Sequence, residues 1–229
     1  MRKRSKRYKE CEKEIDHAKC YAVAEAVDIM KSLKAVKFDE SVDIALKLGI
    51  DPKKSDQLIR GAFSLPNGTG KKPTIIVFTT GENVDKAKKA GASEVGAEEL
   101  IKKVQGGWLD FDVAISSPEL MREVGKLGKV LGPQGKMPSP KSGTVTKEIE
   151  KTVKEFMAGK IEFKTDAAGC VHGLMGKVSF PAKNLVENIQ AFTKHIVGLR
   201  PTSSKGTFLL KASMSSSMGQ GLLVDLQNL

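Results

Sequence analysis

The residues best suited to contacting phosphate groups gather in a segment rich in glycine and lysine, from residue 125 to 141. Glycine allows a close backbone approach, and lysine ammonium groups pair with phosphate oxygens. Neither the GxGxxG nor the GxxxxGKS/T spacing of nucleotide-binding loops occurs in this segment or elsewhere in the chain. We therefore expect contacts with a nucleic-acid backbone, although a solvated loop would have the same composition. The candidate phosphate contacts are Lys126, Lys129, Lys136 and Lys141.

Residue types that carry catalysis or bind metals form no recognisable site in this sequence. The three histidines and three cysteines show no CxxC pair and no spacing typical of metal ligands. There is no GxSxG nucleophile motif, and no pair of carboxylates stands out as a general acid and base. We therefore predict a protein that is not an enzyme and has no metal and no cofactor. An enzyme or nucleotide-binding protein is the alternative.

Two short segments carry groups that suit RNA. Lys37 and Phe38 precede an expected strand, where the ring can stack on a base while the amine meets phosphate. Burial of Phe38 in the core is the competing interpretation. The stretch from Ser213 to Gly219 offers hydroxyl groups for phosphates and ribose 2′-hydroxyls, and its glycine permits close approach. A flexible polar tail is the common alternative for such a stretch.

The overall charge favours a polyanionic partner. With 38 lysines and arginines against 27 aspartates and glutamates, the net charge is +11, which favours salt-sensitive binding to nucleic acid. A basic protein without such a partner has the same charge. The basic residues from Arg2 to Lys9 precede a charged stretch and not an apolar one, and no run is long enough to span a membrane. We predict a cytoplasmic protein.

The two ends of the chain are expected to form amphipathic helices and strands with one wet face. Apolar residues at helical spacing predict a helix over 23–33, and strict alternation predicts a strand over 41–48. Further strands are expected over 60–65, 160–165 and 207–214, and one over 171–178 that can pair with 160–165. A helix capped at Ser179 would bury Leu185, Ile189, Phe192 and Ile196.

The middle of the chain follows a different pattern. Continuous apolar runs over 74–78 and 112–116 predict strands covered on both faces. They alternate with expected helices that end at Gly91, span 98–104, begin after Ser117 and run from a cap at Thr146 to Gly159, which indicates a parallel α/β unit. A loop is expected over 127–143, and the glycines and prolines of 65–73 mark a domain boundary or hinge.

Several segments together resemble the bacterial family of ribosomal protein L-one, the protein of the large-subunit stalk. The similarity runs in the family's order from about residue 20 to the end of the chain. The segments that carry it are Phe38–Val42, Leu48–Gln57, Leu65–Gly70, Gly107–Asp112, Gly125–Pro140, Gly143–Thr146, Gly159–Phe163 and Ser215–Gly219.

The resemblance implies an architecture that agrees with the patterns above. The fold class is α/β with two domains: a discontinuous domain with a mainly antiparallel sheet, over 1–66 and 159–229, and an inserted Rossmann-like parallel α/β domain over 67–158. Two hinge strands would join them. The hinge residues are Pro66, Gly68, Gly70 and Gly159.

The resemblance also implies a function. Members bind 23S rRNA at the mobile stalk of the 50S subunit, beside the E site, assist release of the deacylated tRNA, and repress the mRNA of their own operon. The free protein would be a monomer. The second-domain lysines would make lesser contacts with rRNA or tRNA. By motif match, the main RNA-binding residues are Lys37, Phe38, Glu40, Ser41, Lys164, His172, Ser215, Ser217, Met218 and Gly219.

The sequence departs from the family pattern at three places. Ser217-Met-Gly-Gln220 stands where the family usually has Thr-Met-Gly-Pro, so the hydroxyl is kept and the stiff proline is not. Lys136 is gained and an arginine lost in the glycine–lysine segment, which puts a bidentate phosphate contact in doubt. Asn67 replaces the hinge histidine common in the family.

Overall fold

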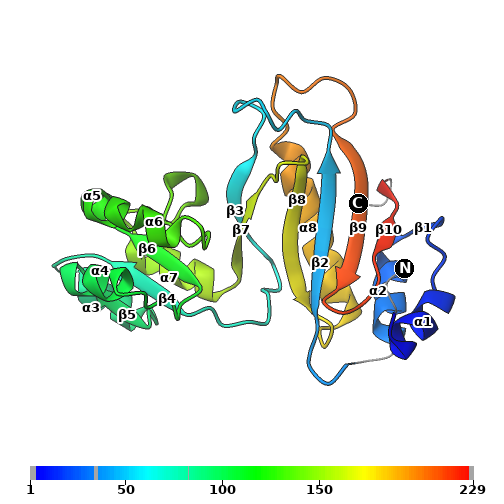
Figure 1. Cartoon of the computed structure of the whole chain (residues 1–229), viewed down its shortest axis with the longest axis horizontal. Helices are drawn as coiled ribbons and strands as arrows, with labels where there is room; N and C mark the ends of the chain where they lie inside the picture. The colour runs from blue at the N-terminus through cyan, green and yellow to red at the C-terminus, as the bar shows by residue number, and fades with distance from the viewer. Residues whose placement is uncertain (1–3, 34–35, 82, 227–229) are drawn as a thin grey trace. The chain divides into compact units, whose positions relative to one another are not determined.

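The computed structural model describes residues 4–33, 36–81 and 83–226 and shows a mixed α/β fold (Figure 1). The chain divides into two compact units, Met1–Gly70 with Ile161–Leu229 and Lys71–Lys160, which we call the first and second domains. The first has a mostly antiparallel sheet and the second an all-parallel one, so the predicted fold class is confirmed. Of the basic residues from Arg2 to Lys9, Arg2 and Lys3 lie outside the described residues, and Lys6, Arg7 and Lys9 lie in α1 (Lys6–Lys13).

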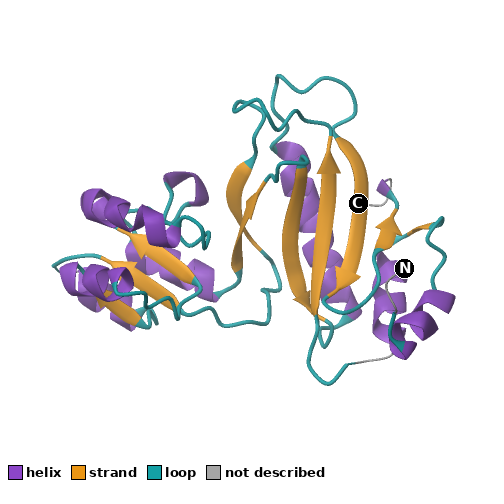
Figure 2. Cartoon of the chain, in the orientation of Figure 1, coloured by secondary structure: helices purple, strands orange, loops and turns teal. Residues whose placement is uncertain are grey.

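The first domain is built on a five-stranded sheet covered on one face by helices. Its strand order is β1 (Cys20–Tyr21), β10 (Leu222–Val224), β9 (Leu209–Ser216), β2 (Ser41–Leu48) and β8 (Cys170–Lys177). Central β2 pairs antiparallel with both β8 and β9. Figure 2 shows the helices behind these strands. The face toward the viewer therefore keeps the polar residues of the alternating pattern.

The alternation of buried apolar residues with more exposed ones along β2 explains why the helices lie on one face of the sheet only. Val42, Ile44, Leu46 and Leu48 are buried, as the sequence pattern predicts, and pack with α2 (Val23–Ser32) and α8 (Ala182–Gly198). Burial of each such side chain stabilises the fold by roughly 1.5–3 kcal/mol. The predicted core face of α8 is confirmed, because Leu185, Ile189, Phe192 and Ile196 are fully buried.

Two expectations for the first domain are wrong. Strand β7 (Lys160–Lys164) pairs with β3 (Arg60–Ser64) in a separate ribbon, whereas β8 joins the large sheet; one bridge, Thr165 to Val171, connects the two. The reason is that β8 buries alternate residues against the helix layer. The other error is the cap: Ser179 Oγ donates to Asp39 Oδ2 (2.7 Å), and α8 begins after Pro181 instead.

The second domain is a three-layer α/β unit. Its parallel sheet has the order β5 (Glu94–Gly96), β4 (Ile75–Phe78), β6 (Val113–Ser116). All four β4 side chains are buried: Ile75 and Val77 pack with α3 (Asn83–Lys89) and α7 (Ile149–Met157), and Ile76 and Phe78 pack toward α4 (Glu98–Gln105). Burial on both faces explains the continuous apolar run.

The expected loop from residue 127 is helical in its first part. A run of short helical turns comprises η1 (Pro118–Leu120), α5 (Met121–Val124), η2 (Gly125–Leu127) and α6 (Gly128–Leu131), and η3 (Pro140–Ser142) follows later. Val124, Leu127 and Leu131 are fully buried on one side of it. Core packing here outweighs the low helix propensity of glycine. Within the described ranges, no helix combines the length and apolar character needed to cross a membrane.

Candidate nucleic-acid interface

The loop after β9 is tied to the segment that precedes β2 by a buried carboxylate. Glu40 Oε2 accepts hydrogen bonds from Ser216 Oγ (2.6 Å) and from the backbone N of Met218 (2.9 Å). Glu40 is only 8% exposed, so these charge-assisted bonds are shielded from water. The geometry therefore holds two segments that lie about 180 residues apart in one rigid arrangement.

Ser217 completes this junction with its backbone and side chain. Its backbone N donates to the Ser41 carbonyl (3.0 Å), and its hydroxyl accepts from Ser41 N (3.0 Å). Lys177 then donates to Ser41 Oγ (2.9 Å) and to the Asp39 carbonyl (3.3 Å). Lys177 was not predicted from the sequence as a residue of this interface. Only the pairing of β2 with β8, which places Lys177 opposite Ser41, reveals it.

Two large apolar side chains project from this junction into solvent. Phe38 is 55% exposed and Met218 is 54% exposed. The alternative that Phe38 fills the core is therefore wrong. Gly219 supports the arrangement, because a Cβ there would lie 2.3 Å from Ser216 Oγ. Exposed aromatic and thioether groups beside a rigid polar loop suit stacking on unpaired bases.

Helix α1 is fastened to the same loop. Arg7 Nη2 donates to the Met218 carbonyl (2.6 Å), and Gln220 Nε2 donates to the Tyr8 carbonyl (3.1 Å). Gln220 is nearly buried, at 3% exposed. The residue that stands in place of the family's proline therefore holds the loop through a side-chain hydrogen bond to α1.

The uncovered face of the sheet carries the remaining candidates of the first domain. In the strand register, Ala45 is flanked by His172 on β8 and Ser213 on β9, and Asp43 is flanked on β9 by Ser215. His172 is exposed. Lys164 is exposed at the end of β7, next to the bridge that joins this ribbon to β8. These residues therefore lie on the uncovered face of the sheet or, for Lys164, beside the bridge that joins the ribbon to it.

Charges on this surface influence one another. Burial raises the pKa of Asp43, and the nearby positive charges of Lys177 and His172 oppose that rise. His172 Nε2 lies 3.4 Å from Asp166 Oδ2. The pKa of Asp166 is lowered chiefly by the hydrogen bond from the backbone N of Cys170, with His172 adding to the effect. Asp43 and Asp166 therefore each lie near a basic side chain.

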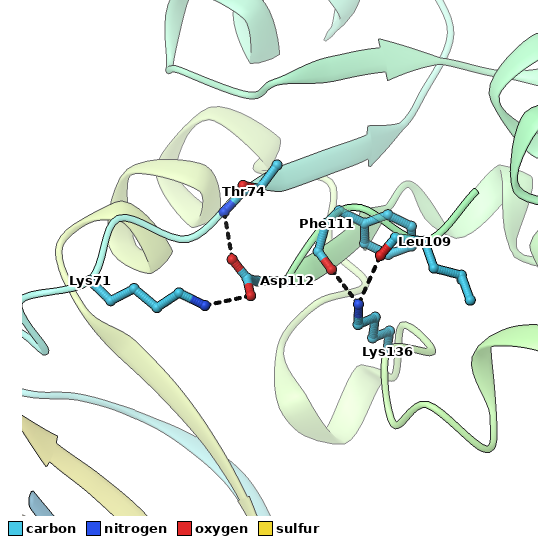
Figure 3. A network of polar contacts seen from close by, with 6 residues as sticks. All are labelled: Lys71, Thr74, Leu109, Phe111, Asp112 and Lys136. Atoms are coloured by element: carbon cyan, nitrogen blue, oxygen red, sulfur yellow. Dashed lines mark hydrogen bonds and ion pairs between the residues drawn. The ribbon is translucent and has the colours of Figure 1, made fainter. Parts of the chain in front are cut away.

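The lysines of the glycine–lysine segment lie in the second domain and behave differently from one another. Lys126, Lys129 and Lys141 are exposed. The ammonium group of Lys136 points inward, donating to the carbonyls of Leu109 (3.0 Å) and Phe111 (2.5 Å) (Figure 3). Lys136 therefore stabilises the domain, and its ammonium group is solvated by those carbonyls.

The first predicted hinge is anchored at its start to the first domain. The fully buried Asn188 accepts from Asn67 N (3.0 Å) and donates to the carbonyls of Gly68 (3.0 Å) and Met175 (2.8 Å). Gly70 has a φ of +74°, and a Cβ there would lie 2.8 Å from the Phe180 ring. The chain is thus held against the first domain up to Gly70.

The same connection is anchored to the second domain directly afterwards. Asp112 accepts from Lys71 Nζ (2.6 Å) and Thr74 N (3.0 Å), as Figure 3 shows. Burial alone would raise the pKa of Asp112, but the hydrogen bonds from Lys71 and Thr74 and the nearby positive charges lower it. The second connection passes through Gly159, whose φ of +111° suits glycine.

No cluster of three or more histidine, cysteine, aspartate or glutamate residues that could hold a metal occurs in the described part of the chain. The fold thus defines a two-domain α/β protein whose first domain carries a polar surface held by hydrogen bonds between distant segments. The chain belongs to the ribosomal protein L1p/L10e family, whose model matches residues 29–220. The family match confirms the resemblance found in the sequence. It also bears out the prediction that the protein is not an enzyme, because the family is one of ribosomal proteins.

Similar proteins cover the whole chain. It is 52% identical over 227 residues to the large ribosomal subunit protein uL1 of Protochlamydia amoebophila, covering 99% of this chain and 96% of that protein. Identity is 50% over 229 residues to the uL1 protein of Chlamydia caviae, with 100% and 99% covered. The chain is 48% identical over 227 residues to the uL1 protein of Kosmotoga olearia, and the match covers 99% of this chain and 98% of that protein.

Proposed function

We propose that this chain is a structural constituent of the large ribosomal subunit that binds 23S rRNA at the mobile stalk beside the E site. The names of its full-length relatives support membership of the large subunit. The observation that carries RNA binding is the junction at Glu40, which holds Phe38 and Met218 outward in one rigid arrangement. Such a surface can read an unpaired RNA junction by stacking and shape.

Charge supplies the second contribution to binding. The net charge of +11 favours approach to RNA, and exposed lysines on both domains can each displace a counterion from phosphate. In this proposal the first domain makes the main rRNA contact, and Lys126, Lys129 and Lys141 make lesser contacts with rRNA or the departing tRNA. Movement of the second domain about the hinges would let the stalk follow the deacylated tRNA as it leaves.

The same surface would serve translational repression. An mRNA of the protein's own operon that folds into a similar junction would compete with rRNA for the Phe38 and Met218 surface. In this proposal the free protein acts as a monomer.

A gel shift tests the proposal directly. The purified protein is titrated against a stalk-junction fragment of 23S rRNA and against a plain RNA duplex of equal length, at two salt concentrations. We expect tight binding to the junction that persists at the higher salt and weak, salt-labile binding to the duplex. Equal and salt-labile binding to both RNAs would mean that the protein binds RNA only through non-specific charge, and it would refute stalk recognition.

A further inference from the structure

A pocket of about 350 Å³ opens beside the loop after β9. It is formed by five separated parts of the first domain: α1, the end of α2, the segment before β2, the turn after β8 and the loop itself. Its volume lies within the range of about 300–1,000 Å³ that is typical of ligand sites. The lining residues that matter here are Arg7, Leu33, Val36, Phe38, Glu40 and Gly219.

The walls of the pocket are held in place by polar contacts. The bonds from Arg7 to the Met218 carbonyl and from Gln220 to the Tyr8 carbonyl fasten α1 against the loop. On another side, Lys31 Nζ donates to the carbonyl of Phe180. A pocket with fixed walls loses little conformational entropy when it is filled, so it is prepared for an occupant.

The chemistry of the lining is that of a site for a flat, polar-edged ring. Leu33 and Val36 contribute apolar wall, and Phe38 adds an exposed aromatic ring. Glu40 Oε2 accepts two hydrogen bonds that fix the carboxylate in place, and Glu40 also lines the pocket. A carboxylate held in this way can accept from an amino group at the edge of a base.

We propose that this pocket receives one unpaired nucleobase of the bound RNA, with Phe38 stacking on the ring and Glu40 accepting from its edge. The inference rests on the proposed function and adds a defined subsite to it. A double helix is too wide for a pocket of this size, whereas a single splayed-out base fits. Arg7 supplies a positive charge at the lining for the attached phosphate.

Filling the pocket tests the inference. Val36→Phe adds a ring to the lining. Val186→Phe is the matched control, because Val186 lines a different pocket of about 410 Å³ on the helix layer of the same domain. We expect Val36→Phe to weaken binding to the stalk-junction fragment about tenfold or more, with the slope of affinity against salt reduced at most by the one contact of Arg7. The control should bind as the wild type does.

An abasic scan identifies the base and separates insertion from general obstruction. Each unpaired nucleotide of the fragment is replaced in turn by an abasic one. At one position, removal of the base should weaken wild-type binding about tenfold and leave Val36→Phe binding unchanged, because the variant has already lost that contact. The inference would be wrong if the affinity losses from abasic replacement and from Val36→Phe added at every position. It would also be wrong if Val36→Phe bound with wild-type affinity. Failure of the wild type to prefer the junction would refute the proposed function instead.

Discussion

Phe38 and Met218 project into solvent although both are strongly apolar. Single exposed apolar residues are ordinary on protein surfaces, so exposure alone says little. Here the Met218 backbone is bonded to Glu40, and Phe38 lies two residues before Glu40 in the segment that Glu40 and Ser41 tie to the loop. Ser217 differs from them because its hydroxyl also accepts a bond from Ser41 N. An alanine at Ser217 would therefore remove a structural contact together with any RNA contact.

Alanine at Phe38 or at Met218 should separate binding from stability. We expect each variant to bind the stalk-junction RNA about tenfold more weakly, which is the effect of losing one stacking platform. The melting temperature should stay within about 2 °C of wild type, because surface changes alter stability by roughly 0.5 kcal/mol or less.

Leu58→Ala is the control, since Leu58 is also a large exposed apolar residue and is not among the predicted RNA contacts. A fall of melting temperature beyond about 5 °C in the Phe38 or Met218 variant would mean that the side chain packs in the core. Equal affinities of all three variants would show that the RNA surface lies elsewhere.

At the level of elements, helix α8 does more than cover the sheet. Its apolar face fills the core through residues such as Phe192, and its one fully buried amide, Asn188, bonds to the first hinge connection and to β8. A buried amide with three partners is favourable only while all of them are present. The helix therefore sets where the connection leaves the first domain.

Asn188→Ala should destabilise the protein by roughly 2–4 kcal/mol, because it removes the partner of the buried Met175 carbonyl and of the partly buried backbone groups of Asn67 and Gly68. Chemical denaturation measures the change. Asn184→Ala, on the same helix, is the control, because only its backbone carbonyl contacts the hinge connection. Equal stability of the two variants would show that the amide contributes nothing beyond packing.

Across the whole molecule, the two anchors confine the first hinge to a short stretch. Asn188 holds the chain up to Gly68, and Asp112 holds it from Lys71 onward. Each anchor lies within one domain, so neither resists rotation between them. We propose that rotation of the second domain is concentrated at Gly70–Lys71 in the first connection and near Gly159 in the second.

Small-angle scattering of the free and RNA-bound protein tests this hinge. We expect the free protein to require a range of domain arrangements to fit its profile, because the two anchors of the first connection each lie within one domain. Scattering that fits a single arrangement, unchanged by the stalk-junction fragment, would rule out the swinging second domain and leave a rigid scaffold.

The sequence by itself determined the fold class and most elements, because burial imposes periodicity. Alternation over 41–48 and the continuous run over 74–78 each match a strand whose covered faces follow from that pattern. It also determined the family, since eight matching segments in order are far more specific than a single motif. The second domain's short helices after residue 127 were missed, because glycine lowers local propensity while burial of Leu127 and Leu131 is a tertiary effect.

Only the tertiary structure decided which partners those elements take and what the candidate residues touch. The pairing of β8 with β2, the exposure of Phe38 and the inward position of Lys136 depend on segments distant in the chain. The same holds for Lys177, which joined the interface through strand register alone. Local periodicity reports which face of a helix or strand is buried. Long-range packing decides the neighbours and the exposure of single side chains, because those neighbours are adjacent in space but not in sequence.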